Sequence, residues 1–164
     1  METPTNTRHD LYDILKGFDT AMMVVKASDG HIHGRPMAIA LLQETAEMYF
    51  VTSLGSPKVA AIQADPTITV TFQSSSQFAT VSGHASLVID KPMIVDLWQE
   101  SWKLWFPEGK DDPSICLIHF SPEDGEYWNN AGTQGLKYAF AAVKAYVTGT
   151  TPASDQAQHA KVDL

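Results

Sequence analysis

Alternating hydrophobic and polar positions recur along the first 130 residues, and they predict a series of short strands. The clearest alternation lies in residues 67–74 (TITVTFQS), where β-branched residues recur at every second position. Gly83 lies inside a longer strand-like segment and predicts a β-bulge there. The other strands are expected at residues 20–27, 34–42, 48–53, 78–89, 114–120 and 126–129, with a turn at 121–125.

Helical spacing of apolar residues is confined to four segments. The first, at residues 7–17, places Leu11, Ile14 and Leu15 on one face. The other helices are expected at residues 56–64, 90–105 and 131–147. From residue 148 onward the chain is polar with little to bury, so residues 148–164 are expected to form a flexible tail.

Six or seven strands in largely antiparallel order, with few helices, predict a mainly β protein: a small β-barrel with flanking helices. At 164 residues the chain is long enough for one domain with its own core, expected over residues 1–147. Small barrels of this kind often cover their sheet edges by dimerising.

Charge and cysteine usage narrow the function classes. The net charge of −8 argues against binding to nucleic acid or to an anionic membrane surface, which both require a basic face. No apolar run approaches the roughly 20 residues of a membrane span, and the first residues do not resemble a signal peptide. The single cysteine, Cys116, fits a reducing compartment. These features indicate a cytoplasmic protein.

The segment FVTSLGSPKV, residues 50–59, carries the most suggestive chemistry. It passes from a strand into a helix in which Ser56 is the expected N-cap and Pro57 the first helical residue. Lys58 then stands at the positive end of the helix, where a cation is favourable only if an anion is also bound. Arg35, on a neighbouring strand, could converge on the same point. The alternatives are a phosphate site or a capped helix with a solvated lysine.

Five motifs occur together, in an order that resembles one known family. They are Arg35-Pro36-Met37, Phe50-Val51-Thr52-Ser53-x-x-Ser56-Pro57-Lys58, Val81-Ser82-Gly83-His84-Ala85, Trp102-x-x-Trp105-Phe106-Pro107 and Glu126-Tyr127-Trp128. The set resembles the pyridoxamine 5′-phosphate oxidase-like flavin proteins, in particular their short general stress protein branch. The resemblance covers roughly residues 8–130.

That resemblance implies a split-barrel homodimer with FMN sites at the dimer interface, although a larger flavin such as FAD stays open. By this resemblance, Arg35 and Lys58 would hold the FMN phosphate. Trp128 matches a tryptophan of the family that approaches the flavin from the other subunit. The remaining cofactor-binding positions it implies are Pro36, Met37, Ala38, Val51, Thr52, Ser53, Ser56 and Pro57.

Departures from the family pattern bear on the activity. The oxidases have a lysine at the position of Ala40, a second basic residue at the position of Pro57, and a glutamine near the flavin at the position of Phe78. Their substrate-phosphate segment is replaced here by residues 129–134 (NNAGTQ), which contain no basic residue. Oxidation of pyridoxamine 5′-phosphate is therefore not expected. Two hypotheses follow: a flavin-dependent oxidoreductase, or a flavin-binding stress protein without turnover that acts as a store, buffer or sensor.

No catalytic residue and no metal ligand can be assigned from the sequence. The pair His31 and His33 lacks a nearby carboxylate, and His84 is left without an assigned role. Cys116 and His119 are expected in the core or at an interface. A helical stripe is formed by Trp98, Trp102 and Trp105. These residues could cover a flavin ring by stacking, but the stripe is expected to be core or dimer interface.

Overall fold

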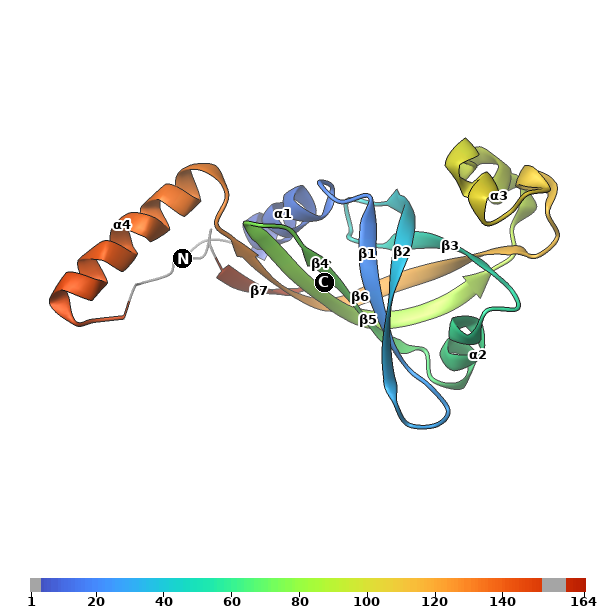
Figure 1. Cartoon of the computed structure of the whole chain (residues 1–164), viewed down its shortest axis with the longest axis horizontal. Helices are drawn as coiled ribbons and strands as arrows, with labels where there is room; N and C mark the ends of the chain where they lie inside the picture. Colours follow the sequence, from blue (N-terminus) through green and yellow to red (C-terminus); the bar gives the residue numbers. More distant parts are fainter. Residues whose placement is uncertain (1–3, 152–158) are drawn as a thin grey trace.

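The structure is a computed structural model that describes residues 4–151 and 159–164. Its strands form one antiparallel sheet in the order β3-β2-β1-β4-β5-β6-β7, and an additional β3–β6 pairing closes the first six into a barrel (Figure 1). This closure confirms the predicted mainly β fold. The strands are β1 (Thr20–Lys26), β2 (Ile32–Leu42), β3 (Met48–Ser53), β4 (Thr67–Gln73), β5 (Gln77–Val88), β6 (Ile115–Asn129) and β7 (His159–Asp163).

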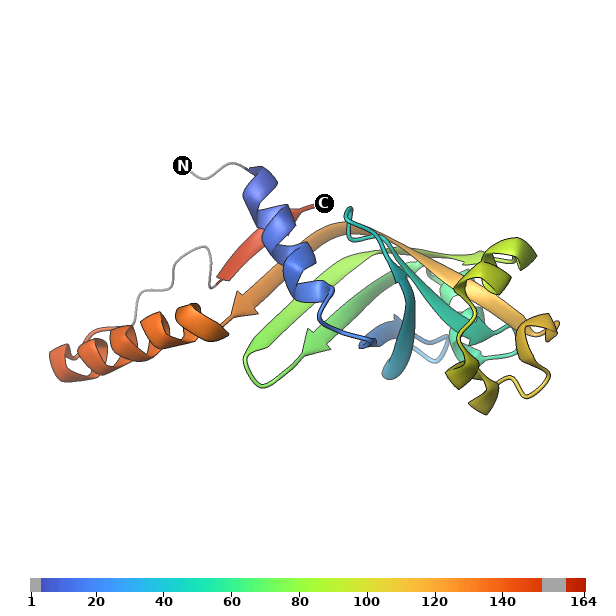
Figure 2. The same cartoon turned by 90° about the horizontal axis from the view of Figure 1, so that it is seen from above.

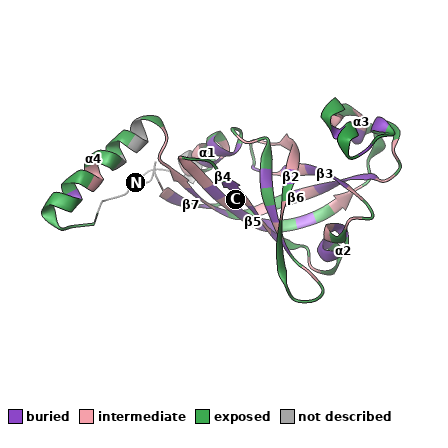
Figure 3. Ribbon diagram, in the orientation of Figure 1, coloured by how far each residue is buried: buried purple, intermediate pink, exposed green. Residues whose placement is uncertain are grey.

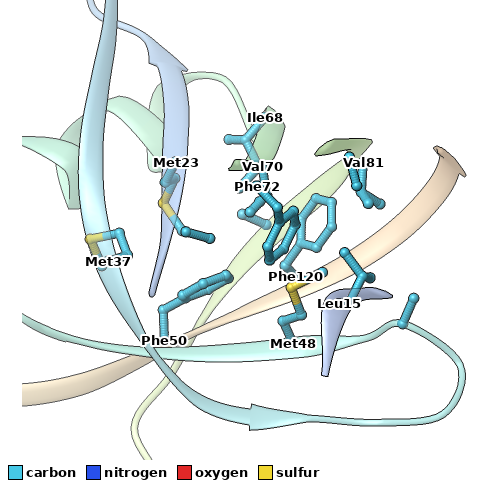
Figure 4. Close-up of a cluster of buried hydrophobic side chains, with 14 of the residues drawn as sticks. Leu15, Met23, Met37, Met48, Phe50, Ile68, Val70, Phe72, Val81 and Phe120 are labelled. Atoms are coloured by element: carbon cyan, nitrogen blue, oxygen red, sulfur yellow. The ribbon is translucent and has the colours of Figure 1, made fainter. Parts of the chain in front are cut away.

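The barrel interior holds the main hydrophobic core. The alternate residues Ile68, Val70 and Phe72 of β4 point inward, as the sequence pattern predicted. They meet Phe50 from β3 and Phe120 from β6 inside the barrel (Figure 4). Buried positions accordingly follow the barrel strands, whereas the outlying helix at the far end is largely exposed (Figure 3).

Strand β6 is a single long strand, so the prediction of two strands around a turn at residues 121–125 is wrong. Pro122 and Gly125 indicate a turn when they are considered locally. In the structure Ser82 lies opposite Asp124 and Gly83 lies opposite Pro122, so Glu123 is an extra residue in β6 and forms a β-bulge there, where a residue without an N–H is tolerated. The predicted irregularity at Gly83 is confirmed, but the extra residue belongs to β6 and not to the strand that contains Gly83.

The length of β6 lets it pair with two different strands on one side. Its first part pairs with β3, from Met48↔Phe120 to Ser53↔Ile115. Its last part pairs with β7, from Asp124↔Asp163 to Trp128↔His159. The barrel thus opens where β6 leaves β3, and β7 covers the exposed edge beyond that point.

Strand β7 shows that the expected flexible tail is wrong for residues 159–163. Ala160 and Val162 are buried, and the carbonyl oxygen of Asp163 accepts a hydrogen bond from Arg8 Nε at 2.7 Å. A five-residue alternation is too short to stand out within a polar segment, but it can pair with the free edge of β6. Residues 152–158 of the expected tail lie outside the described residues.

Three of the helices lie against the barrel, whereas the last helix extends away from it (Figures 1 and 2). Helix α1 (Pro4–Leu15) covers the core with Leu11, Ile14 and Leu15, as predicted. Helix α2 (Pro57–Ala64) follows β3, and α4 (Gly132–Thr148) follows β6; both match the predicted helices within a residue or two. None of the described helices combines the length and the apolar character needed to cross a bilayer.

The third predicted helix ends much earlier than expected. Helix α3 spans only Lys91–Leu97, and two 3-10 turns follow, η1 (Glu100–Leu104) and η2 (Gly109–Asp111). Trp98 leaves the helix in an extended conformation, and its indole N–H donates to Glu100 at 3.0 Å. The break separates the expected tryptophan stripe, because Trp102 is buried while Trp105 is 59% exposed.

Candidate functional site

A pocket of about 420 Å³ opens beside the N-terminus of α2, and its size is typical of a small-molecule site. The middle of β2, the end of β3 and the segment after η1 form its walls. Its lining residues are Thr20, Pro36, Met37, Ala38, Val51, Thr52, Ser53, Ser56, Lys58, Trp105 and Phe106.

Most of the residues that the sequence assigned to a cofactor site meet in this pocket. Strand β2 brings Pro36, Met37 and Ala38, and the β3–α2 connection brings the residues from Val51 to Lys58 that line it. Arg35 and Pro57 flank the lining residues without belonging to them. Trp128 lies elsewhere on the chain.

The β3–α2 connection is a tight turn that starts the helix. The N–H of Ser56 donates to the carbonyl oxygen of Ser53 at 3.0 Å, and Pro57 occupies the first turn of the helix. Ser56 is the N-cap residue in an extended conformation, as predicted, but its side chain does not cap the helix. Its hydroxyl instead accepts a hydrogen bond from Lys58. Pro57 has no N–H, and the N–H of Val59 donates to the carbonyl oxygen of Ser56 at 3.0 Å.

Lys58 is held in the pocket by neutral partners. Its Nζ donates to Thr52 Oγ1 at 3.0 Å and to Ser56 Oγ at 3.2 Å. Burial lowers the pKa of Lys58, and the positive charge of Arg35 lowers it further. The structure therefore brings the two predicted cations within electrostatic range of each other.

No carboxylate compensates this pair of cations within the described part of the chain, where neither Lys58 nor Arg35 takes part in an ion pair. Half-buried like charges without a counterion are unfavourable in a ligand-free protein. An anionic ligand would remove this cost, because it would accept hydrogen bonds from both side chains and from the start of α2.

The lowered pKa of Lys58 predicts that the ligand-free protein gains stability as the pH rises towards 10.5. Between the folded pKa and the ordinary value of 10.5, the unfolded chain binds more protons at Lys58 than the folded chain does. The free energy of unfolding should therefore increase across this alkaline window. Urea unfolding at several pH values, compared between the natural protein and Lys58→Met, measures the effect. Identical pH slopes for the two proteins would contradict it.

Three lining residues were not assigned to the site from the sequence: Thr20, Trp105 and Phe106. Thr20 begins β1 and carries no local signal. Trp105 and Phe106 belong to one of the five motifs, and the tryptophan stripe offered stacking on a flavin as an alternative for Trp105. They reach the pocket because α3 breaks after Leu97 and the chain turns back through η1.

Trp128 does not reach the pocket of its own chain. It lies near the end of β6, where its ring stacks on His159 at a centroid distance of 5.1 Å and an interplanar angle of 9°. His159 Nε2 and Glu126 Oε1 are 2.6 Å apart, so this carboxylate fixes the imidazole. Strand β7 thus supports one face of the indole.

The other titratable candidates lie outside the pocket lining. His84 Nδ1 pairs with Glu123 Oε1 at 2.8 Å on an exposed surface. His119 stacks on Tyr49 at 4.6 Å, and Cys116 is fully buried opposite Thr52. Burial raises the pKa of the Cys116 thiol, which opposes formation of a reactive thiolate. Across residues 4–151 and 159–164, no three potential ligands gather to form a metal site.

The closed barrel, the open edge of β6 and the pocket beside α2 together define the split-barrel class. Residues 6–153 match the family described as pyridoxamine 5′-phosphate oxidase like, and the chain belongs to this family. The resemblance noted from the five motifs is thereby confirmed.

Solved structures support the fold independently. A protein described as general stress protein 26 from Jannaschia sp. CCS1 superposes with a TM-score of 0.75 at 23% identity, covering 98% of this chain and 99% of that one. The general stress FMN/FAD binding protein from Xanthomonas citri has a TM-score of 0.66 at 24% identity, covering 78% and 92% of the two chains.

A fungal relative matches this chain over only part of its own length. Protein bli-3 of Neurospora crassa is 26% identical over 139 residues, which cover 77% of this chain and 66% of that protein. The chain therefore spans slightly less than two thirds of bli-3.

Proposed function

We propose that the pocket binds FMN, with the phosphate held by Lys58 and Arg35 at the start of α2. The observation that carries this proposal is the pair of neighbouring cations without a carboxylate counterion in the described residues. The hydroxyls of Thr52 and Ser56 already contact Lys58 and can donate to the same anion.

The rest of the lining suits a flat aromatic ring next to this phosphate site. Val51, Trp105 and Phe106 supply apolar surface, and the lining residues of β2 run past it. The name of the Xanthomonas citri protein states FMN/FAD binding for that relative, which supports a flavin here. FAD is an alternative ligand in this proposal. Its additional adenylate would lie beyond the lining residues described above.

The proposed activity is flavin-dependent electron transfer with a small partner, in which bound FMN would supply the redox chemistry. This chain would anchor the phosphate, orient the ring and exclude water. Lys58 is the only ionisable side chain among the lining residues, so no general acid or base is assigned. That same observation favours the second candidate function, a flavin store, buffer or sensor without turnover.

Oxidation of pyridoxamine 5′-phosphate is not part of the proposal. The region in which the oxidases hold the substrate phosphate corresponds to the end of β6 and the start of α4, where residues 129–134 carry no cation. We also propose that the protein works in the cytoplasm as a homodimer, with Trp128 of each copy completing the site of the other.

Titration of the purified protein with FMN and with riboflavin tests the proposed function. Flavin fluorescence and calorimetry should show that FMN binds more tightly than riboflavin, because only FMN carries the phosphate. Equal affinities for the two flavins, or no binding of either, would contradict the phosphate assignment. Rapid mixing of the FMN complex with NADH or NADPH then separates the two functions: bleaching of the flavin indicates an oxidoreductase, and an unchanged spectrum favours a store or sensor.

A further inference from the structure

Helix α4 carries an apolar stripe that its own chain leaves uncovered. The helix extends away from the barrel in both views of the molecule (Figures 1 and 2). Four of its five described exposed large hydrophobic side chains recur at intervals of four, three and four residues and are between 64% and 77% exposed, whereas the fifth, Tyr146, lies to one side of them. This spacing places them along one side of a helix. The residues of the α4 stripe are Leu136, Phe140, Val143 and Val147.

The α4 stripe lies on the opposite side of the helix from Ala145, the buried position among the described residues of α4. At 100° per residue, Ala145 lies on the side of the helix opposite Phe140 and Val143. Ala145 is buried, whereas Phe140 is 73% exposed. The covered side of α4 is therefore not the apolar side, and the stripe requires another partner.

A complementary surface lies at the other end of the molecule. The segment from α3 to η2, residues 91–112, carries two exposed apolar side chains, Leu104 and Trp105. This segment contains five acidic residues and three lysines, which gives a net charge of −2, whereas α4 contains two lysines and no acidic residue. Apolar surface and charge therefore match between α4 and residues 91–112.

The two complementary surfaces cannot meet within one chain. Helix α4 extends from one end of the barrel, and α3 with η1 and η2 lies at the opposite end (Figures 1 and 2). A second copy of the chain supplies the missing surface. Trp128 also indicates where that copy lies, since α4 begins at Gly132, four positions after it.

We infer that α4 of one copy packs on residues 98–112 of a second copy and closes the mouth of that copy's flavin pocket. The inference rests on the proposed function, in which Trp128 of one copy approaches the pocket of the other. The start of α4, four positions later, would then lie near the same pocket, which is lined by the exposed Trp105. The α4 stripe would cover Trp105 and Leu104 and shield the bound ring from water.

This arrangement makes the partner's helix part of each binding site. Because the pocket is closed only in the dimer, dimerisation and ligand affinity should be thermodynamically linked. The α4 stripe would also account for a long exposed apolar helix in a protein with a net charge of −8.

Photo-crosslinking of the full chain tests the contact directly. A benzoyl-phenylalanine introduced at position 140 is irradiated in an equal mixture of ¹⁴N- and ¹⁵N-labelled protein, and the crosslinked peptides are identified by mass spectrometry. We expect peptides of mixed isotope composition that join position 140 to residues 98–112. Crosslinks confined to one chain, crosslinks to another surface of the second copy, or no crosslink would overturn the inference.

Two substitutions on α4 test whether the stripe, rather than the rest of the helix, forms the dimer contact. Phe140→Ser should raise the dissociation constant of the dimer about tenfold or more, measured by sedimentation, because it removes a central aromatic anchor. Tyr146→Ser is the matched control: Tyr146 is 90% exposed but lies about 90° from the stripe, so the dimer should be unchanged. Equal effects of the two substitutions would overturn the inference.

A failure of the α4 contact can be distinguished from a failure of the proposed flavin binding. FMN and riboflavin titrations of the natural protein report the flavin site, whereas the crosslinks need no ligand. If FMN binds but the crosslinks miss residues 98–112, only the α4 contact is wrong. If the crosslinks reach residues 98–112 but FMN does not bind, the interface holds and the flavin assignment is wrong.

Discussion

Replacing Lys58 by methionine should weaken FMN binding about 10- to 100-fold while leaving riboflavin binding nearly unchanged. Methionine keeps the length of the side chain and its apolar contacts, but it removes the charge and the hydrogen bonds to Thr52 and Ser56. A hydrogen bond to a charged group contributes about 1.5–3 kcal/mol, which corresponds to this range of affinity. The ratio of FMN to riboflavin dissociation constants, measured by flavin fluorescence, isolates the phosphate contribution.

Lys26→Met is the matched control for this prediction. Lys26 is exposed at the end of β1 and does not line the pocket, so its removal changes the net charge equally without touching the site. If both variants weakened FMN binding to the same extent, the effect would reflect overall charge, and the role proposed for Lys58 would be wrong.

Replacing Gly83 by alanine should destabilise the barrel by about 3 kcal/mol or more, which is a large part of the roughly 5–15 kcal/mol typical of a domain. A Cβ at this position would lie 2.1 Å from the carbonyl oxygen of Ser121 and 2.8 Å from the Cα of Pro122. Both atoms belong to the backbone of β6, so relief requires the two strands to move apart at the bulge. Urea unfolding at one fixed protein concentration measures the change.

Gly34→Ala provides the comparison, because Gly34 also lies in a strand but has room for a methyl group. The nearest atom to its added Cβ is the flexible end of Met22, at 3.4 Å. Its stability should change little or rise slightly, since alanine restricts the unfolded chain. Equal stabilities of the two variants would show that β5 and β6 are not as close at Gly83 as the structure indicates.

Prediction from sequence succeeded where local pattern decides structure. Strand β3 and helix α2 were expected within one residue of their observed bounds, because alternation, an N-cap and a proline are all local signals. Lys58 and most of the other residues assigned to a cofactor site lie around one pocket, and their role in binding stays a prediction.

Prediction failed where partners distant in sequence decide structure. Residues 121–125 have turn-forming composition, yet pairing with β5 on one side and β7 on the other keeps β6 extended. Trp105 was expected on a helical stripe with Trp98 and Trp102, but the break after α3 turns it towards the pocket.

The sequence by itself determined the mainly β character, most strand positions and the irregularity at Gly83, because each depends on near neighbours in the chain. Only the tertiary structure decided that β7 completes the sheet edge, that Trp105 forms a wall of the pocket and that the α4 stripe is exposed. These features arise from strand pairing and burial between residues far apart in sequence, and the free energy of such contacts is not encoded in any short segment.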